Sequence, residues 1–210
     1  LMSGTRVWDA LRAVKPSAKV ANLFWRFSTH SSCDLTLTER PTYFSNGRKG
    51  ADVYASDSGF KTLCDDRLGA FPFFHFWGPK ANLESSRWIL DAARLAVDYA
   101  APDLLLCYAP GLDYDIQRFG PSAPETRSTL ERGDELYSAF IEEMLALDYD
   151  VMGVSDYGFS DVTAPVYPNR ALRAAGFIHV DDAVNGEWLE PGASRAFAVC
   201  DNQTAHVYVR

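Results

Sequence analysis

The sequence predicts an α/β domain in which a largely parallel sheet is flanked by helices. Short apolar runs alternate along the chain with longer stretches of helical periodicity, an order typical of parallel strands joined by helices. The apolar runs are almost uninterrupted, which favours strands that are covered on both faces. The chain has 210 residues, 47% of them hydrophobic, which is enough for one domain with a sizeable core.

The first half of the chain contains two predicted strands, a long polar segment and a helix. Residues 19–27 and 71–77 are apolar and aromatic, which predicts strands. Residues 28–57 are polar with little periodicity, which predicts a long loop, and loops of this length inside a compact domain are usually functional. Residues 82–99 predict a helix because apolar residues recur at spacings of three and four, and Asn82 can cap its first turn.

The second half continues the alternation. Residues 103–108 predict another buried strand. Ser122 and Glu125 have the spacing of a capping box, which predicts a helix that runs from there to about residue 147. The remaining elements are short, and we expect strands at residues 150–154, 177–180, 195–200 and 206–209 and a helix at residues 169–175 that stops at Gly176.

The composition argues against several classes of protein. The net charge is −8 and no basic stripe occurs, so we expect no binding to a nucleic-acid scaffold. No apolar run approaches the roughly 20 residues of a membrane span, and no signal peptide is recognisable. The four cysteines are far apart and form no CxxC pair, which argues against a zinc cage. A reducing, cytoplasmic setting is therefore expected, while the oligomeric state stays open.

Acidic side chains follow several of the predicted strands. Asp113 and Asp115 lie in YAPGLDYDIQRFGP, directly after one strand, and Asp156 and Asp201 follow two others. Ligands of parallel sheets bind outside the carboxyl ends of the strands. Carboxylates gathered there repel one another unless a cation lies nearby, which predicts a divalent metal. The alternative is that each aspartate only forms a cap or a turn at a strand exit.

Six segments carry a resemblance to a known family. They are ANLFWRFSTHSSCDLTLTERPTYFSNGRKGADVY, FPFFHFWGP, SSRWILDAA, YAPGLDYDIQRFGP, VSDYGFSDVTAPVYPNRALRAAGF and SRAFAVCDNQTAHVYV. In this order they resemble one branch of the type I phosphodiesterase/nucleotide pyrophosphatase family of the alkaline phosphatase superfamily. The resemblance implies one alkaline-phosphatase-like domain over residues 1–210, present only in part, that hydrolyses phosphodiester or pyrophosphate bonds. It also implies a substrate that is a phosphate-containing small molecule or a nucleotide.

The resemblance further implies two metal ions, usually zinc, and a Thr or Ser nucleophile. Asp113 and Asp156 match metal-binding aspartates of the family, and we expect their carboxylates to face each other within about 10 Å. Gln117 stands where the wider family has a histidine ligand. Tyr157 replaces the histidine of an Asp-His-Gly signature, although the closer branch usually has Glu-Tyr-Gly. Gln117, Tyr157 and Asp201 are therefore candidate neighbours of the site.

Two more positions lack histidines that the closer branch usually has, namely Gly111 and Asn202. The remaining oxygen ligands suit magnesium, manganese or calcium better than zinc, so we expect weak zinc affinity. No family nucleophile is recognisable before Lys19, which leaves the catalytic residue unassigned. We expect an internal portion or a trimmed member of the family that has little phosphodiesterase activity by itself. The alternative is a non-catalytic member that acts as a binding or scaffold module.

Four further residues allow two readings each. Arg48 and Lys49 lie in NGRKG and either contact a substrate phosphate or form a solvated loop tip. Arg118 either pairs with Asp115 or reaches a phosphate. His75 lies among aromatic residues, where a buried imidazole with a hydrogen-bond partner is preferred over a ligand.

Overall fold

The computed structural model describes residues 4–46 and 48–210. The chain divides into two compact units, a first unit of Leu1–Ser160 and a second unit of Asp161–Arg210. A single domain over residues 1–210 therefore stays a prediction. Among the described residues, no helix combines the length and the apolar character that crossing a membrane would need.

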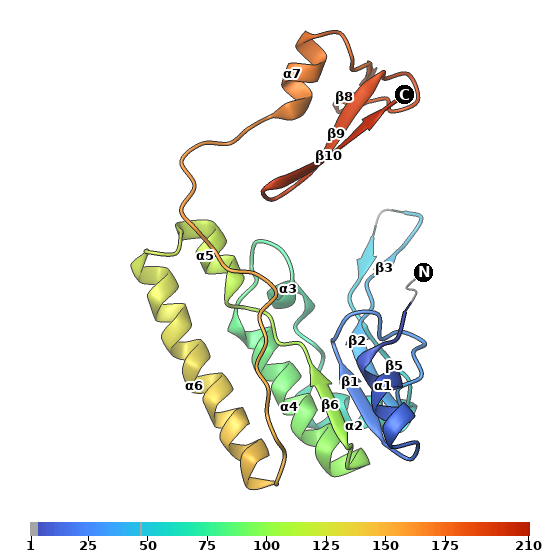
Figure 1. The fold of residues 1–210 in the computed structure, drawn as a ribbon, viewed down its shortest axis with the longest axis vertical. Helices are drawn as coiled ribbons and strands as arrows, with labels where there is room; N and C mark the ends of the chain where they lie inside the picture. The colour runs from blue at the N-terminus through green and yellow to red at the C-terminus, as the bar shows by residue number, and fades with distance from the viewer. Residues whose placement is uncertain (1–3, 47) are drawn as a thin grey trace. The chain divides into compact units, whose positions relative to one another are not determined.

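The first unit is built on a four-stranded sheet with the strand order β5-β2-β1-β6 (Figure 1). The central strand β1 (Val20–Leu23) is parallel to both β2 (Leu35–Glu39) and β6 (Leu104–Cys107), and β5 (Val53–Ala55) runs antiparallel to β2. Ala21 pairs with Leu35 on one side and with Leu105 on the other. The prediction of a mixed α/β fold with a largely parallel sheet is thus confirmed for this unit.

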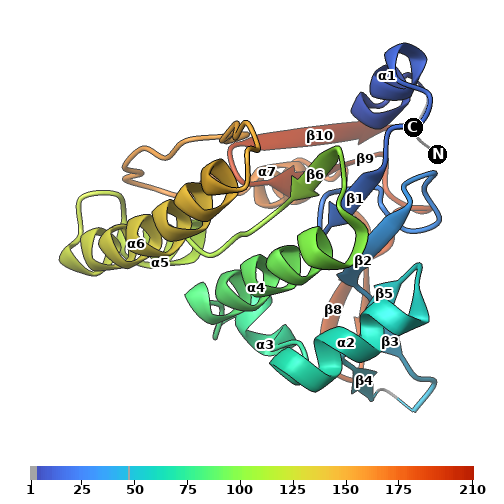
Figure 2. The ribbon, with the colours of Figure 1, turned by 90° about the horizontal axis from the view of Figure 1, so that it is seen from below.

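Helices cover the two faces of this sheet unequally. Figure 2 shows α1 (Val7–Val14) and α4 (Leu83–Ala100) on opposite sides of the sheet. Ala21 and Leu23 point into the larger core, which α4 shares with α2 (Ser58–Leu68) and α6 (Pro124–Ala146). Val20 points the other way, towards Trp8 of α1 in a smaller apolar cluster. Successive side chains of β1 therefore point to opposite faces of the sheet and contribute to both apolar clusters.

The predicted loop over residues 28–57 is wrong, because this segment contains β2, β5 and the short hairpin of β3 (Thr42–Tyr43) and β4 (Lys49–Gly50). Two threonines of β2, Thr36 and Thr38, are buried together with its leucines. Threonine favours strands through its branched side chain, yet it reduces the apolar content of the segment. The strand therefore reads as a polar region in the sequence.

The predicted strand at residues 71–77 is also wrong. Phe73–Phe76 form the short helix α3. Phe71 and Phe76 contact each other with ring centroids 5.4 Å apart, and Phe71 lies 5.1 Å from the Trp88 ring. The aromatic side chains of this segment therefore pack as a compact cluster against α4, and the segment does not pair with a strand.

Both long helices of the first unit are confirmed, but only one of their predicted caps is. The side chain of Asn82 accepts a hydrogen bond from the backbone N–H of Glu84 at 2.8 Å, as expected of an N-cap. The capping box predicted for Ser122 and Glu125 is wrong. The helix α6 begins at Pro124, whose missing N–H and fixed φ suit the first helical position.

The strand predicted at residues 150–154 is not formed. Val151, Met152 and Val154 are exposed, the methionine by 86%, and these residues have no strand assignment. A strand needs a hydrogen-bonded neighbour as well as apolar, branched residues. This segment has no such neighbour within the described part of the chain.

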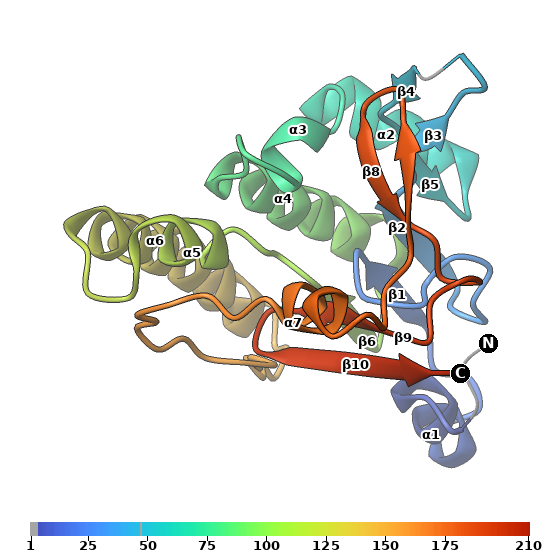
Figure 3. The same cartoon turned by 90° about the horizontal axis from the view of Figure 1, so that it is seen from above.

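The second unit consists of one helix and two antiparallel hairpins (Figure 3). The predicted helix is confirmed as α7 (Pro168–Ala174) and is followed by Gly176 with a φ of 75°. Two of the predicted strands are confirmed as β9 (Ala196–Asp201) and β10 (Thr204–Val209). The strand predicted at residues 177–180 is shifted to β7 (Val180–Ala183), and its partner β8 (Gly186–Leu189) was not predicted.

We expect replacement of Asp57 by alanine to destabilise the first unit by about 1 kcal/mol. Asp57 caps α2 by accepting from the backbone N–H of Phe60 at 2.8 Å, and it accepts from the Tyr99 hydroxyl at 3.0 Å. These hydrogen bonds lower the pKa of Asp57. Folding therefore favours the carboxylate, and the stabilisation is present above the ordinary pKa of aspartate and lost as the pH falls below it.

Urea denaturation between about pH 3 and pH 7 checks this expectation. The difference in unfolding free energy between the parent and Asp57→Ala should be largest near neutral pH and should shrink towards pH 3. The matched variant Asp57→Asn retains a capping acceptor and should lose less. A difference that is constant over this pH range would contradict the role of the charge.

Candidate functional site

The carboxyl ends of β2, β1 and β6 lie at one edge of the sheet because the three strands are parallel. Glu39 is the last residue of β2, Arg26 lies three residues beyond the end of β1, and Tyr108 directly follows β6. The backbone N–H of Tyr108 donates to the carbonyl oxygen of Leu23 at 3.0 Å. This hydrogen bond joins the ends of β1 and β6 at the edge where ligands bind in such sheets.

Asp113 is the first residue of α5 (Asp113–Phe119), which follows β6. Its Oδ2 accepts from Nε2 of Gln117 and from the hydroxyl of Tyr157, each at 3.0 Å. Its Oδ1 is buried and has no hydrogen-bond partner among the described residues. A buried carboxylate oxygen without a partner is costly, so this atom is suited to a cation or a water molecule.

Asp156 belongs to the same electrostatic environment as Asp113. Burial is the main cause of the raised pKa of Tyr108, and the negative charges of Asp113 and Asp156 add to it. Burial, the hydrogen bond to Asp113 and the nearby Asp156 raise the pKa of Tyr157 to about 12. Both phenols therefore stay protonated at neutral pH and remain hydrogen-bond donors. The close approach of the two carboxylates stays a prediction, which these shared neighbours support.

The segment that leads from β6 into α5 is held by close contacts around Gly111. Gly111 has a φ of 130°, and a Cβ at this position would lie 2.9 Å from Oγ of Ser86 and 3.2 Å from the carbonyl oxygen of Asn82. Only glycine adopts such a conformation without strain. The Tyr137 hydroxyl donates to the carbonyl oxygen of Ala109 at 3.0 Å and so fixes the segment to α6.

Asp115 and Arg118 form a structural network. Oδ2 of Asp115 accepts from the hydroxyl of buried Thr129 at 2.6 Å, and Oδ1 accepts from Arg118 at 2.7 Å. Arg118 also donates to the carbonyl oxygen of Pro79 at 2.8 Å. Of the two readings of Arg118, pairing with Asp115 is the one that the structure shows. The two aspartates of YAPGLDYDIQRFGP thus differ, because Asp115 is fully paired and Asp113 is not.

The remaining predicted residues are Arg48, Lys49, Asp201 and His75. Arg48 is exposed beside the turn of the β3–β4 hairpin, so its contact with a phosphate stays a prediction, and the side chain of Lys49 lies outside the described residues. Asp201 belongs to the second unit, and its place near the site also stays a prediction. His75 is not buried as expected, because its imidazole is partly exposed and pairs with Glu84.

Three residues of this edge were not predicted from the sequence. The guanidinium carbon of Arg26 lies 5.2 Å from the centroid of the Tyr108 ring, within the range of a cation–π contact. Nη1 of Arg26 lies 3.9 Å from Oε1 of Glu39. Recognition of β2 as a strand would have placed Glu39 at the carboxyl edge, but the order of the strands could not be read from local patterns.

The oxygen atoms of this cluster fit a hard divalent cation. Oδ1 of Asp113 is unpaired, and Asp156 supplies a second carboxylate beside the same tyrosines. Magnesium, manganese and calcium prefer such oxygen ligands, whereas zinc prefers imidazole and thiolate. The described residues contain no group of three or more His, Cys, Asp or Glu side chains arranged around a metal position.

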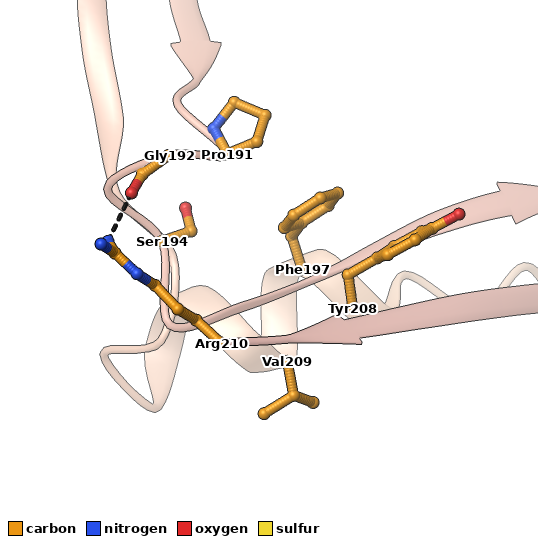
Figure 4. A pocket seen from close by; sticks show the side chains of 7 residues that line it. All are labelled: Pro191, Gly192, Ser194, Phe197, Tyr208, Val209 and Arg210. Carbon is orange, nitrogen blue, oxygen red and sulfur yellow. Dashed lines mark hydrogen bonds between the residues drawn. The ribbon is translucent and has the colours of Figure 1, made fainter.

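The second unit has a cavity of its own, of about 360 Å³, which Figure 4 shows from close by. Phe197 and Tyr208 stack on one side of it, and Arg210 donates to the carbonyl oxygen of Gly192 at 2.6 Å. Among the described residues, none of those that line it is acidic.

Comparison with known proteins gives one match. The family model described as type I phosphodiesterase / nucleotide pyrophosphatase matches residues 1–210. Neither the curated proteins nor the solved structures contain a match.

Proposed function

Because the chain belongs to the type I phosphodiesterase / nucleotide pyrophosphatase family, we propose that it carries the site of a metal-dependent hydrolase of phosphodiester or pyrophosphate bonds, or a central part of that site. The observation that supports this most strongly is the buried, unpaired Oδ1 of Asp113 at the carboxyl edge of the sheet. The substrate is then a small phosphate-containing molecule or a nucleotide. The four free cysteines suit the cytoplasmic setting that we propose with it.

Asp113 and Asp156 are the residues that would hold the metal. A bound divalent ion supplies charge stabilisation for the attacking and leaving oxygens of a phosphoryl group. Gln117 and Tyr157 both donate to Oδ2 of Asp113, so they fix the orientation of the carboxylate and leave Oδ1 free. The protonated hydroxyl of Tyr108 is a hydrogen-bond donor beside the carboxylates and is available for a phosphoryl oxygen. The nucleophile remains unassigned.

One observation favours the alternative of a non-catalytic binding module. Gln117 and Tyr157 occupy positions of family histidines, and their contacts are to Asp113. Neither an amide N–H nor a protonated phenol is a good metal ligand. A site of this kind can retain a weakly held cation and a bound phosphate ester while it loses turnover.

We expect slow hydrolysis of bis-p-nitrophenyl phosphate that depends on manganese or magnesium, and we expect replacement of Asp156 by asparagine to slow it about 10- to 100-fold. Release of p-nitrophenol over hours with each metal, and after addition of EDTA, measures this dependence. The matched control is Asp66→Asn, which removes an exposed carboxylate from α2 and should leave the rate unchanged.

Two outcomes would contradict the proposal. Tight stoichiometric zinc binding that is lost in Asp113→Ala would show that the metal preference is wrong. Binding of manganese without any turnover above the uncatalysed rate would favour the non-catalytic alternative.

A further inference from the structure

The loop that follows β1 has an unusual backbone. Phe24, Phe27 and His30 have φ values of 60°, 57° and 55°, a conformation that residues other than glycine rarely adopt. Phe24 is buried in the larger core of the first unit. Such strain persists only where the surrounding structure imposes it, and it is frequent at ligand-binding sites. The loop therefore presents the intervening residues, among them Arg26, in a defined direction at the carboxyl edge.

Arg26 lies near Glu39 and over the ring of Tyr108, and neither contact neutralises its charge. On the side of β2, its closest carboxylate oxygen belongs to Glu39, at 3.9 Å, which is at the limit of an ion pair. On the side of β6, the guanidinium lies over the ring of Tyr108 at 5.2 Å from the centroid. The side chain is 67% exposed. An arginine has five N–H donors, and this geometry leaves several of them for a ligand.

Tyr108 has both positive and negative neighbours, namely Arg26 and the two aspartates Asp113 and Asp156. Burial raises the pKa of the Tyr108 phenol, Arg26 acts against this, and Asp113 and Asp156 raise the pKa further. The phenol thus lies near one cation and near both candidate metal ligands. A phosphate ester that approaches the two carboxylates is repelled by them. The planar guanidinium that lies over the Tyr108 ring can bind two phosphoryl oxygens at once.

We propose that Arg26 binds the non-bridging phosphoryl oxygens of the substrate and so positions the phosphorus atom beside Asp113 and Asp156. This inference rests on the proposed function and names the anion-binding residue of the same site. The competing role for Arg26 is structural, as a clamp that ties the loop after β1 to Glu39 and Tyr108. The two roles differ in what happens to phosphate affinity when the guanidinium is removed.

The experiment measures the affinity for inorganic phosphate by calorimetry in the presence of manganese, for the parent chain and four variants. Arg26→Gln should weaken phosphate binding about 10- to 100-fold, since hydrogen bonds to charged groups are among the stronger ones. Arg26→Lys keeps the charge but not the planar fork and should be intermediate. Glu39→Gln should not weaken binding. Arg87→Gln removes an exposed arginine from α4 and is the matched control for net charge.

The outcomes separate this inference from the proposed function. Phosphate binding that is lost in Arg26→Gln, in a chain without turnover, supports the role of Arg26 and contradicts the hydrolase. Turnover with an unchanged KM and an unchanged phosphate affinity in Arg26→Gln supports the hydrolase and overturns the role of Arg26. A lower melting temperature of Arg26→Gln with unchanged phosphate affinity would show that Arg26 is a structural clamp. If Arg87→Gln weakens phosphate binding as much as Arg26→Gln does, the inference of a specific site is overturned. If Arg26→Gln fails to fold, unchanged phosphate affinity in Arg26→Lys overturns the inference.

Discussion

Replacement of Asp113 by alanine is expected to reduce metal-dependent turnover about 10³-fold and to abolish manganese binding. Asp113 supplies a buried carboxylate oxygen that has no hydrogen-bond partner in the described part of the chain, so we expect no neighbouring side chain to replace it. Gln117, one of the two donors to its other oxygen, is exposed and can turn to solvent. The variant should therefore lose function and keep its fold.

The stability of the metal-free variant distinguishes a site residue from a structural one. Asp113→Ala removes the cost of burying the unpaired Oδ1 but also the two hydrogen bonds that Oδ2 accepts from Gln117 and Tyr157, so the unfolding free energy of the metal-free chain should change little. Asp115→Ala is the matched comparison, since it removes a carboxylate that Thr129 and Arg118 satisfy and should destabilise the chain. If Asp113→Ala loses stability as Asp115→Ala does and retains its metal affinity, Asp113 is structural.

Replacement of Phe60 by alanine is expected to destabilise the first unit by about 3–5 kcal/mol. Phe60 lies in α2 with none of its surface exposed, and its ring centroid is 5.3 Å from that of Tyr99. Its ring belongs to the larger core, which contains both sheet and helix residues. The cavity that the lost ring leaves would border several elements. The variant keeps the backbone N–H of residue 60, so the hydrogen bond that this group donates to Asp57 is retained.

Urea denaturation measures this loss, and Phe74→Ala is the control. Phe74 has the same side chain, but it lies in α3 with 60% of its surface exposed, so its removal should change the unfolding free energy by less than about 0.5 kcal/mol. Similar losses in the two variants would show that burial in the larger core does not account for the contribution of Phe60.

The parts of the fold that local patterns predict are those in which one periodicity dominates. The helix α4 has an apolar face and an asparagine cap, and β6 is an uninterrupted apolar run. By contrast, β2 alternates leucine with buried threonine, and residues 71–77 are aromatic because they fill a cluster. Both errors arise because the burial of a side chain depends on its tertiary neighbours, and local sequence propensities carry no information about these neighbours.

The site shows the same limit more sharply. Asp113 and Asp115 are two residues apart and chemically identical, yet Thr129, which pairs with one of them, comes from the next helix. Arg26 and Tyr108 are far apart in the sequence and meet only because β1 and β6 are neighbours. The family resemblance predicts Asp113 and Asp156 as site residues without spatial information, whereas the contact of Arg26 with Tyr108 is visible only in the structure.

The pairing of β1 with two strands of very different sequence distance has a consequence for folding kinetics. Ala21 pairs with Leu35, which is close to it in the sequence, and with Leu105, which is far from it in the sequence. Contacts between residues far apart in the sequence form slowly, because the entropy cost of closing a long loop comes before the favourable energy of the contact. The pairing of β1 with β2 can thus precede the pairing with β6 that brings Arg26 to Tyr108. Phosphate affinity should then be among the last properties to return during refolding, after the helical circular dichroism signal has recovered.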